Sequence, residues 1–122
     1  MKWDSLVQEI DDELSHVWMV RTFLKHSDEA EEDDDVNEIH RQLYDYAHAL
    51  GPALESKDWI KYLRLAKKKL KKLLEANALF QEVQPEISSH TNFQMACRSL
   101  NLAVIRIASL VEQYELADLK NL

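Results

Sequence analysis

Apolar residues recur at intervals of three and four positions along four long stretches of the chain. In the first stretch the repeat runs through Trp3, Leu6, Ile10, Leu14, Val17 and Leu24. In the third it runs through Trp59, Leu63, Ala66, Leu70, Leu73 and Leu74. Because an α-helix turns about 100° per residue, this spacing gathers apolar side chains on one face. The pattern predicts four amphipathic helices, over about 3–26, 36–50, 57–84 and 89–119.

Polar and turn-forming residues mark where these helices are expected to begin and end. In residues 27–35, seven of nine side chains are acidic, which favours an exposed loop whose last Asp residues cap the second helix. Gly51 is expected to end that helix in a left-handed conformation, and Pro52 to prevent its continuation. Pro85 is expected to end the third helix. The expected N-terminal caps of the third and fourth helices are Ser56 or Asp58, and Ser88 or Ser89.

The fold class follows from these helices and their short connections. The chain has 122 residues, one Gly and two Pro, too few turn residues for an all-β protein of this length. We expect an all-α, single-domain protein over residues 1–122, built as an up-down-up-down four-helix bundle. An orthogonal packing of four helices, or a fourth helix exchanged with a partner chain, are the alternatives.

Charge and composition narrow the function classes. The net charge of −7 disfavours nucleic acid as a partner, because phosphate backbones attract basic surfaces. The single cysteine, Cys97, has no second cysteine for an intramolecular disulfide. No apolar run is long enough to cross a membrane, and the N-terminal residues lack the apolar core of a signal peptide. These features predict a cytoplasmic protein that does not bind membranes.

Several large apolar residues fall away from the predicted core faces. They are Trp18, Met19 and Phe23 on the first helix, Leu65, Leu79 and Val83 on the third, and Leu102, Ile105 and Leu116 on the fourth. Monomers rarely expose large contiguous apolar patches. We therefore predict a homodimer, formed through the first and fourth helices. A monomer whose helices pack more centrally is the alternative.

One pair of residues suggests a metal site. Glu13 and His16 form a Glu-x-x-His unit, in which two side chains three residues apart can reach one ion. This unit resembles the ferritin-like di-iron carboxylate bundles, which use it twice. The resemblance implies a divalent metal, and Glu9, Glu13, His16 and His40 are the candidate ligands.

Acidic pairs give a second, looser resemblance. Glu9-x-x-Asp12 and Glu31-x-x-Asp34 are similar to the acidic pairs of all-α nucleoside-triphosphate pyrophosphohydrolases. In that family, helical carboxylates hold Mg²⁺ against the substrate phosphates. A solvated acidic turn is the simpler interpretation of the second pair.

A third resemblance concerns Arg41 and His48, which are separated by six residues. Their spacing is similar to the Arg-x(4–6)-His motif of the HEPN ribonucleases, small all-α dimers. The resemblance implies that Arg41 would stabilise a phosphate and His48 would assist proton transfer. In the second helix both residues are expected on one exposed face.

The remaining candidate residues are three polar residues on the predicted core faces and one run of basic residues. Arg21, Asn77 and Asp118 lie near the centres of their stripes. A buried Arg needs an acidic partner, for which Asp118 is the candidate, whereas Asn77 is expected to fix helix register. The run 67–72 contains five Lys, which we expect to form the solvated side of a helix or to bind an acidic partner.

These observations leave two hypotheses from different classes. The first is a small acidic helical protein that acts by self-association and protein–protein interaction, without catalysis or cofactor. The alternative is a phosphoester or RNA hydrolase, either metal-dependent through Glu9, Glu13, His16 and His40 or HEPN-like through Arg41 and His48. No complete catalytic motif is present, and helical bundles host many unrelated functions.

Overall fold

A computed structural model describes residues 2–120, which form six α-helices and no strand. The helices are α1 (Lys2–Lys25), α2 (Glu29–Glu32), α3 (Asp34–Glu55), α4 (Trp59–Lys68), α5 (Leu70–Ile87) and α6 (Thr91–Lys120). The predicted all-α class is confirmed, but the predicted count of four helices is wrong for this part of the chain. The differences lie in a short helix within the acidic stretch and in a break of the third predicted helix.

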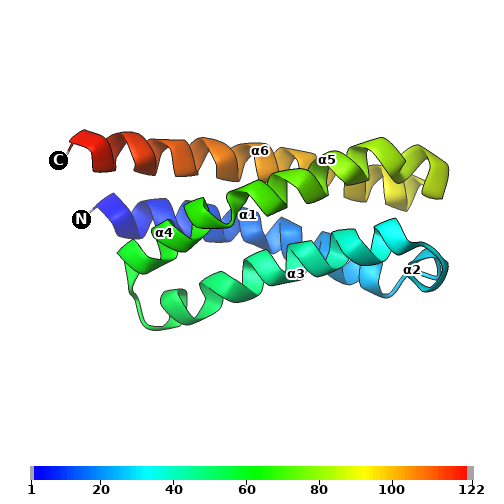
Figure 1. Ribbon diagram of the computed structural model, residues 1–122, viewed down its shortest axis with the longest axis horizontal. Coiled ribbons are helices and arrows are strands. Elements are labelled where there is room, and N and C mark those ends of the chain that lie inside the picture. The colour runs from blue at the N-terminus through cyan, green and yellow to red at the C-terminus, as the bar shows by residue number, and fades with distance from the viewer. Residues whose placement is uncertain (1, 121–122) are drawn as a thin grey trace.

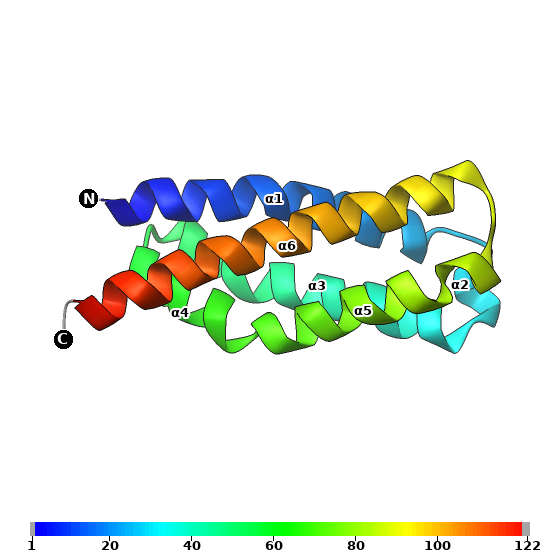
Figure 2. The ribbon, with the colours of Figure 1, turned by 90° about the horizontal axis from the view of Figure 1, so that it is seen from above.

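The long helices run side by side along one axis (Figure 1). α1 packs against α3 and α6, and α5 packs against α3 and α6. The chain reverses direction three times, between α1 and α3, between α3 and α4, and between α5 and α6, so both ends of the described chain lie at one end of the molecule (Figures 1 and 2). α6 packs against α1 and α5 on one side, and no helix of residues 2–120 covers its other side (Figure 1).

The third predicted helix, 57–84, is divided at Lys69 into α4 and α5. The side chain of Tyr46 on α3 is buried against this break, where its hydroxyl donates a 2.8 Å hydrogen bond to the carbonyl of Ala66. An uninterrupted helix would use that carbonyl for the N–H of Leu70. A side chain that enters the ladder of hydrogen bonds is a recognised cause of helix kinks. The break is therefore a tertiary effect, which the periodicity of the segment does not reveal.

Gly51, Pro52 and Pro85 do not end their helices as predicted. α3 continues to Glu55, and the residue with a left-handed φ is Lys57, at 57°, rather than Gly51. Continuing the helix buries Ala53, while Pro52 removes only one hydrogen bond near the C-terminal end. Pro85 likewise lies inside the last turn of α5, where a proline removes only one hydrogen bond near the C-terminal end.

The predictions for the acidic stretch and for the helix caps are confirmed in part. A single turn, α2, replaces the expected loop and buries Ala30. The carboxylate of Asp33 accepts hydrogen bonds from the N–H groups of Asp35 and Val36, at 2.8 and 3.1 Å, and so caps α3. Asp58 caps α4, as predicted. α6 begins only at Thr91, where the ring of His90, rather than Ser88 or Ser89, accepts from the N–H of Asn92.

One core fills the space between the long helices. Its largest fully buried side chains are Tyr62, Phe80, Ile10, Leu24, Ile39, Leu43, Leu50, Leu63, Leu73, Leu100, Ile107 and Leu110. Tyr62 and Leu110 lie outside the predicted stripes, and the predicted core residue Leu74 is exposed. Leu74 directly follows the fully buried Leu73 and lies about 100° from it around the helix, which places it outside the buried face.

Candidate functional site

The outward face of α6 carries the most prominent apolar surface of the described chain. Five side chains there are more than half exposed: Met95, Leu102, Ile105, Leu116 and Leu119. We call this set the α6 stripe. Seen from that side, α6 lies in front of the other helices (Figure 2). The intervening residues Val104 and Ile107 are fully buried, so the two faces of this helix are clearly separated.

The α6 stripe follows a heptad repeat. Positions 95, 102, 109 and 116 are seven residues apart, and positions 98, 105, 112 and 119 form the second row. Alternating steps of three and four with this period are the pattern by which one helix pairs with another in a coiled coil. The three polar exceptions are Arg98, Ser109 and Glu112.

The predicted interface residues of the fourth helix all belong to this stripe. Leu102, Ile105 and Leu116 are exposed, and the sequence prediction missed Met95 and Leu119. Both lie on the flanks when angles are measured at 100° per residue. The 3.5-residue period would have included them, because a heptad row drifts about 20° per repeat around a straight helix.

The predicted interface residues of the first helix separate into three environments. Trp18 leans toward α3, with its ring centroid 5.9 Å from that of Tyr44. Met19 is exposed, whereas Phe23 is partly buried with its ring edge-on to Phe93, 5.0 Å between centroids. These residues therefore do not form the single continuous surface expected for α1. The three apolar residues that were predicted to lie away from the core on the third helix are not fully exposed either. Leu65, Leu79 and Val83 are partly buried against the core.

Arg21 has aromatic neighbours rather than the predicted carboxylate. Its guanidinium lies 4.7 Å from the ring centroid of Trp18 and 4.8 Å from that of Tyr44. Its Nε is buried without a hydrogen-bond partner. Asp118 is exposed, contrary to prediction. The reason is topological, because Phe93 lies beside Phe23 and places Asp118 at the opposite end of α6 from Arg21.

Asn77 is the buried polar side chain of the core, at 8% exposure. Its amide donates to the Oδ1 of Asn101 on α6 at 3.0 Å. Gln81 donates to both the Oδ1 of Asn77 and the carbonyl of Cys97, at 3.1 and 2.9 Å. Burial raises the pKa of the Cys97 thiol, which disfavours the reactive thiolate. These hydrogen bonds link α5 to α6.

The four candidate metal ligands do not come together. Glu9 forms a 3.1 Å ion pair with Arg106 on α6, and His40 on α3 donates to Asn37 at 3.1 Å. Glu13 and His16 lie on α1, where His16 is exposed. Within residues 2–120, no three His, Cys, Asp or Glu side chains are placed to hold one metal ion. The geometry of the described residues therefore gives no support to the metal-site hypothesis, which stays a prediction.

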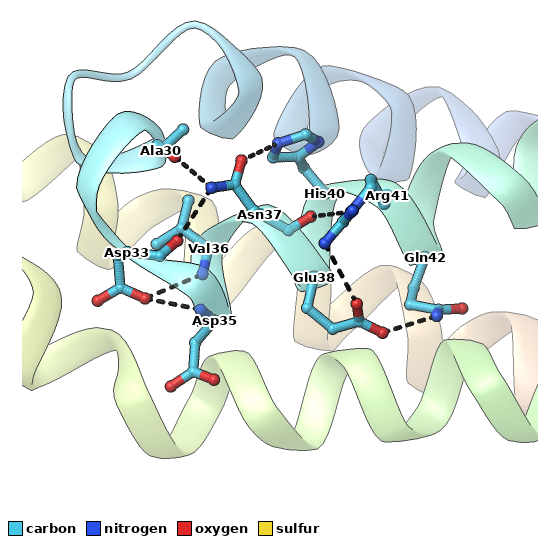
Figure 3. A network of polar contacts seen from close by, with 9 residues as sticks. All are labelled: Ala30, Asp33, Asp35, Val36, Asn37, Glu38, His40, Arg41 and Gln42. Carbon is cyan, nitrogen blue, oxygen red and sulfur yellow. Dashed lines mark hydrogen bonds and ion pairs between the residues drawn. The ribbon is translucent and has the colours of Figure 1, made fainter.

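The polar surface of α3 is organised by contacts within the segment itself (Figure 3). The side-chain amide of Asn37 donates to the carbonyl of Ala30 and so joins α2 to α3, while its oxygen accepts from His40. Arg41 donates to the carbonyl of Asn37 at 3.2 Å and lies 3.6 Å from the carboxylate of Glu38. Burial, together with the positive charges of Arg21, Arg41 and Lys25, lowers the pKa of His40.

Arg41 and His48 both lie exposed on α3, but each is engaged by a neighbour. His48 stacks on Tyr44, with 5.2 Å between ring centroids and planes within 12°. Arg41 is held by Glu38, as described above. This geometry does not favour the RNA-cleaving alternative.

An open groove of about 320 Å³ lies between α3 and the α4–α5 junction. Two members of the basic run, Lys69 and Lys72, line it together with Asp45 and His48. The mixture of charges and the open form give the groove no defined ligand.

Comparison of the chain with protein-family models, with curated proteins and with solved structures finds no match. In the described part of the chain, no helix has both the length and the apolar character to cross a bilayer.

Proposed function

We propose that this protein is a non-catalytic interaction protein that self-associates through the α6 stripe and presents its remaining surface to another protein. In this proposal the molecule acts as an up-down-up-down bundle of four rods, of which α4 and α5 together form the third. The observation that supports the proposal is the row of more than half-exposed apolar side chains at heptad spacing.

The magnitude of the apolar effect is consistent with reversible association. Covering the exposed half of one Leu or Ile side chain contributes on the order of 1 kcal/mol. Four such residues in each of two copies, Leu102, Ile105, Leu116 and Leu119, contribute on the order of 8 kcal/mol before costs. Lost translational and rotational freedom costs about 4 kcal/mol or more, which leaves about 4 kcal/mol and a weak dimer with a Kd on the order of 1 mM.

Charge also favours α6 as the contact. Three basic residues, Arg98, Arg106 and Lys120, balance three acidic ones, Glu112, Glu115 and Asp118, within α6. The whole chain carries −7. Two copies that meet through α6 therefore bring together their neutral surfaces and keep most of their negative charge apart.

Sedimentation velocity over a concentration series from about 10 µM to about 1 mM tests the proposal. We expect the weight-average mass to rise from 14.3 kDa toward twice that value. Ile105→Asp should keep the protein at 14.3 kDa, since it places a charge in the middle of the α6 stripe. Leu74→Asp is the matched control, because Leu74 is also exposed but lies on α5. A wild-type protein that sediments at the monomer mass throughout would contradict the proposal.

A further inference from the structure

The order of polar and apolar residues along the α6 stripe distinguishes the ways in which two copies can meet. If the helices were parallel, each residue would face its own copy, which sets Glu112 against Glu112 and Arg98 against Arg98. Like charges that face each other across a seam are unfavourable. The parallel arrangement is therefore disfavoured.

In an antiparallel arrangement, the two heptad rows face each other, and three registers give at least three kinds of facing pair. One sets Leu102 against Glu112, and another sets Met95 against Glu112, so both bury a carboxylate against an apolar side chain. In the third register, every apolar position between 102 and 119 faces an apolar one. Ser109 then faces Glu112, and the serine hydroxyl can donate to the carboxylate.

Resting on the proposed self-association, we infer that two copies pair their α6 helices antiparallel about a twofold axis that passes between positions 110 and 111. Leu102 faces the partner's Leu119, and Ile105 faces the partner's Leu116. Ser109 and Glu112 form two equivalent polar pairs at the centre, where a polar residue fixes register. In this register, Arg98 and Met95 face positions past Lys120, the last described residue of the partner's α6.

Charge exchange at one facing pair tests the register without new cysteines. Ile105→Asp and Leu116→Lys should each lower self-association at least 100-fold. An equimolar mixture should regain association to within about tenfold of wild type, because one Asp then faces one Lys and the second facing pair is again Ile and Leu. Mixing Ile105→Asp with Leu102→Lys is the matched control, and it should regain nothing.

A distance measurement provides an independent readout. A spin label at Arg98→Cys in a Cys97→Ala background should report a separation of about 38 Å along the axis, from 25 residue steps at 1.5 Å each. The neighbouring register predicts about 27 Å, and parallel helices predict about 10 Å.

The two proposals fail in different ways. If wild-type protein is monomeric at every concentration, the proposed function and this inference both fall. If the wild type dimerises, a mixture without recovery or a separation near 27 or 10 Å overturns the antiparallel register and leaves self-association standing.

Discussion

The outward faces of α3 and α6 differ in whether their side chains have partners within the chain. On α3, Asn37, Arg41 and Gln42 each form a hydrogen bond within their own segment (Figure 3). On α6, the exposed face carries the five apolar side chains of the α6 stripe, and no other helix of the described chain covers it (Figure 2). A polar surface can be completed by neighbours one turn away or by water, whereas an apolar surface is completed only by another surface. This difference is the basis of the proposal that α6 is the contact surface between two copies.

The largest expected effect contrasts two isoleucines on α6. Ile107 is 0% exposed and Ile105 is 58% exposed, although only one residue separates them. Ile107→Ala should lower the free energy of unfolding by about 2 to 5 kcal/mol, because it leaves a cavity in the core. Ile105→Ala should change the unfolding of the monomer by less than about 0.5 kcal/mol and weaken association instead. Urea denaturation at low protein concentration, paired with sedimentation, measures both quantities.

If Ile105→Ala destabilised the monomer as much as Ile107→Ala, the separation of α6 into an inner and an outer face would be wrong. The contrast between the outward faces of α3 and α6 would then have no support.

The inner side of α3 gives the next largest effect. Tyr46→Phe removes the hydroxyl that donates to the Ala66 carbonyl at the break between α4 and α5. We expect a loss of about 1 to 3 kcal/mol in the free energy of unfolding, because a buried carbonyl is left without its donor. Tyr44→Phe is the matched control, since no hydrogen bond of the Tyr44 hydroxyl is found in the described chain. Thermal denaturation of the two variants tests this, and equal melting temperatures would refute it.

A smaller effect is expected where α3 meets α1. Arg21 lies over the rings of Trp18 and Tyr44, an arrangement that contributes about 0.5 to 1 kcal/mol for each partly exposed pair. A double-mutant cycle between Arg21→Gln and Tyr44→Leu should give a coupling energy of that size. The same cycle between Arg21→Gln and Asp118→Asn should give zero. A clear coupling to Asp118 would restore the ion pair that the sequence predicted.

The smallest effect concerns pH. The pKa of His40 lies below its ordinary value of 6.5, because burial and the cations Arg21, Arg41 and Lys25 disfavour its charged form. As pH falls through 6.5, the unfolded chain therefore binds a proton before the folded one does, and stability decreases until the folded pKa is passed. His40→Gln should flatten the stability profile between pH 7 and 5. An unchanged slope in that variant would assign the pH dependence to other groups.

Sequence reasoning located the helices better than their ends or their partners. It predicted α1 and α6 to within two residues, and it named Leu102, Ile105 and Leu116 as outward-facing. It failed where a contact distant in sequence overrides a local rule. The hydroxyl of Tyr46 breaks a continuous amphipathic pattern at Lys69, and burial of Ala53 carries α3 past Pro52.

The proposed metal ligands illustrate the same limit. Glu9, Glu13 and His16 share a flank of α1, but only the packing of α1 on α6 turns Glu9 toward Arg106. Spacing along one helix defines which side chains share a face, not what lies opposite that face. A ligand set that requires His40 from another helix therefore depends on a placement that the sequence pattern does not contain.

What the amino-acid sequence determined by itself is the set of amphipathic helices, because helical periodicity and capping act within a few residues. The tertiary structure decided which faces meet, which carbonyl receives the Tyr46 hydroxyl, and which apolar row on α6 is left uncovered. Those outcomes depend on contacts between residues far apart in the chain, whose geometry exists only once the helices have packed.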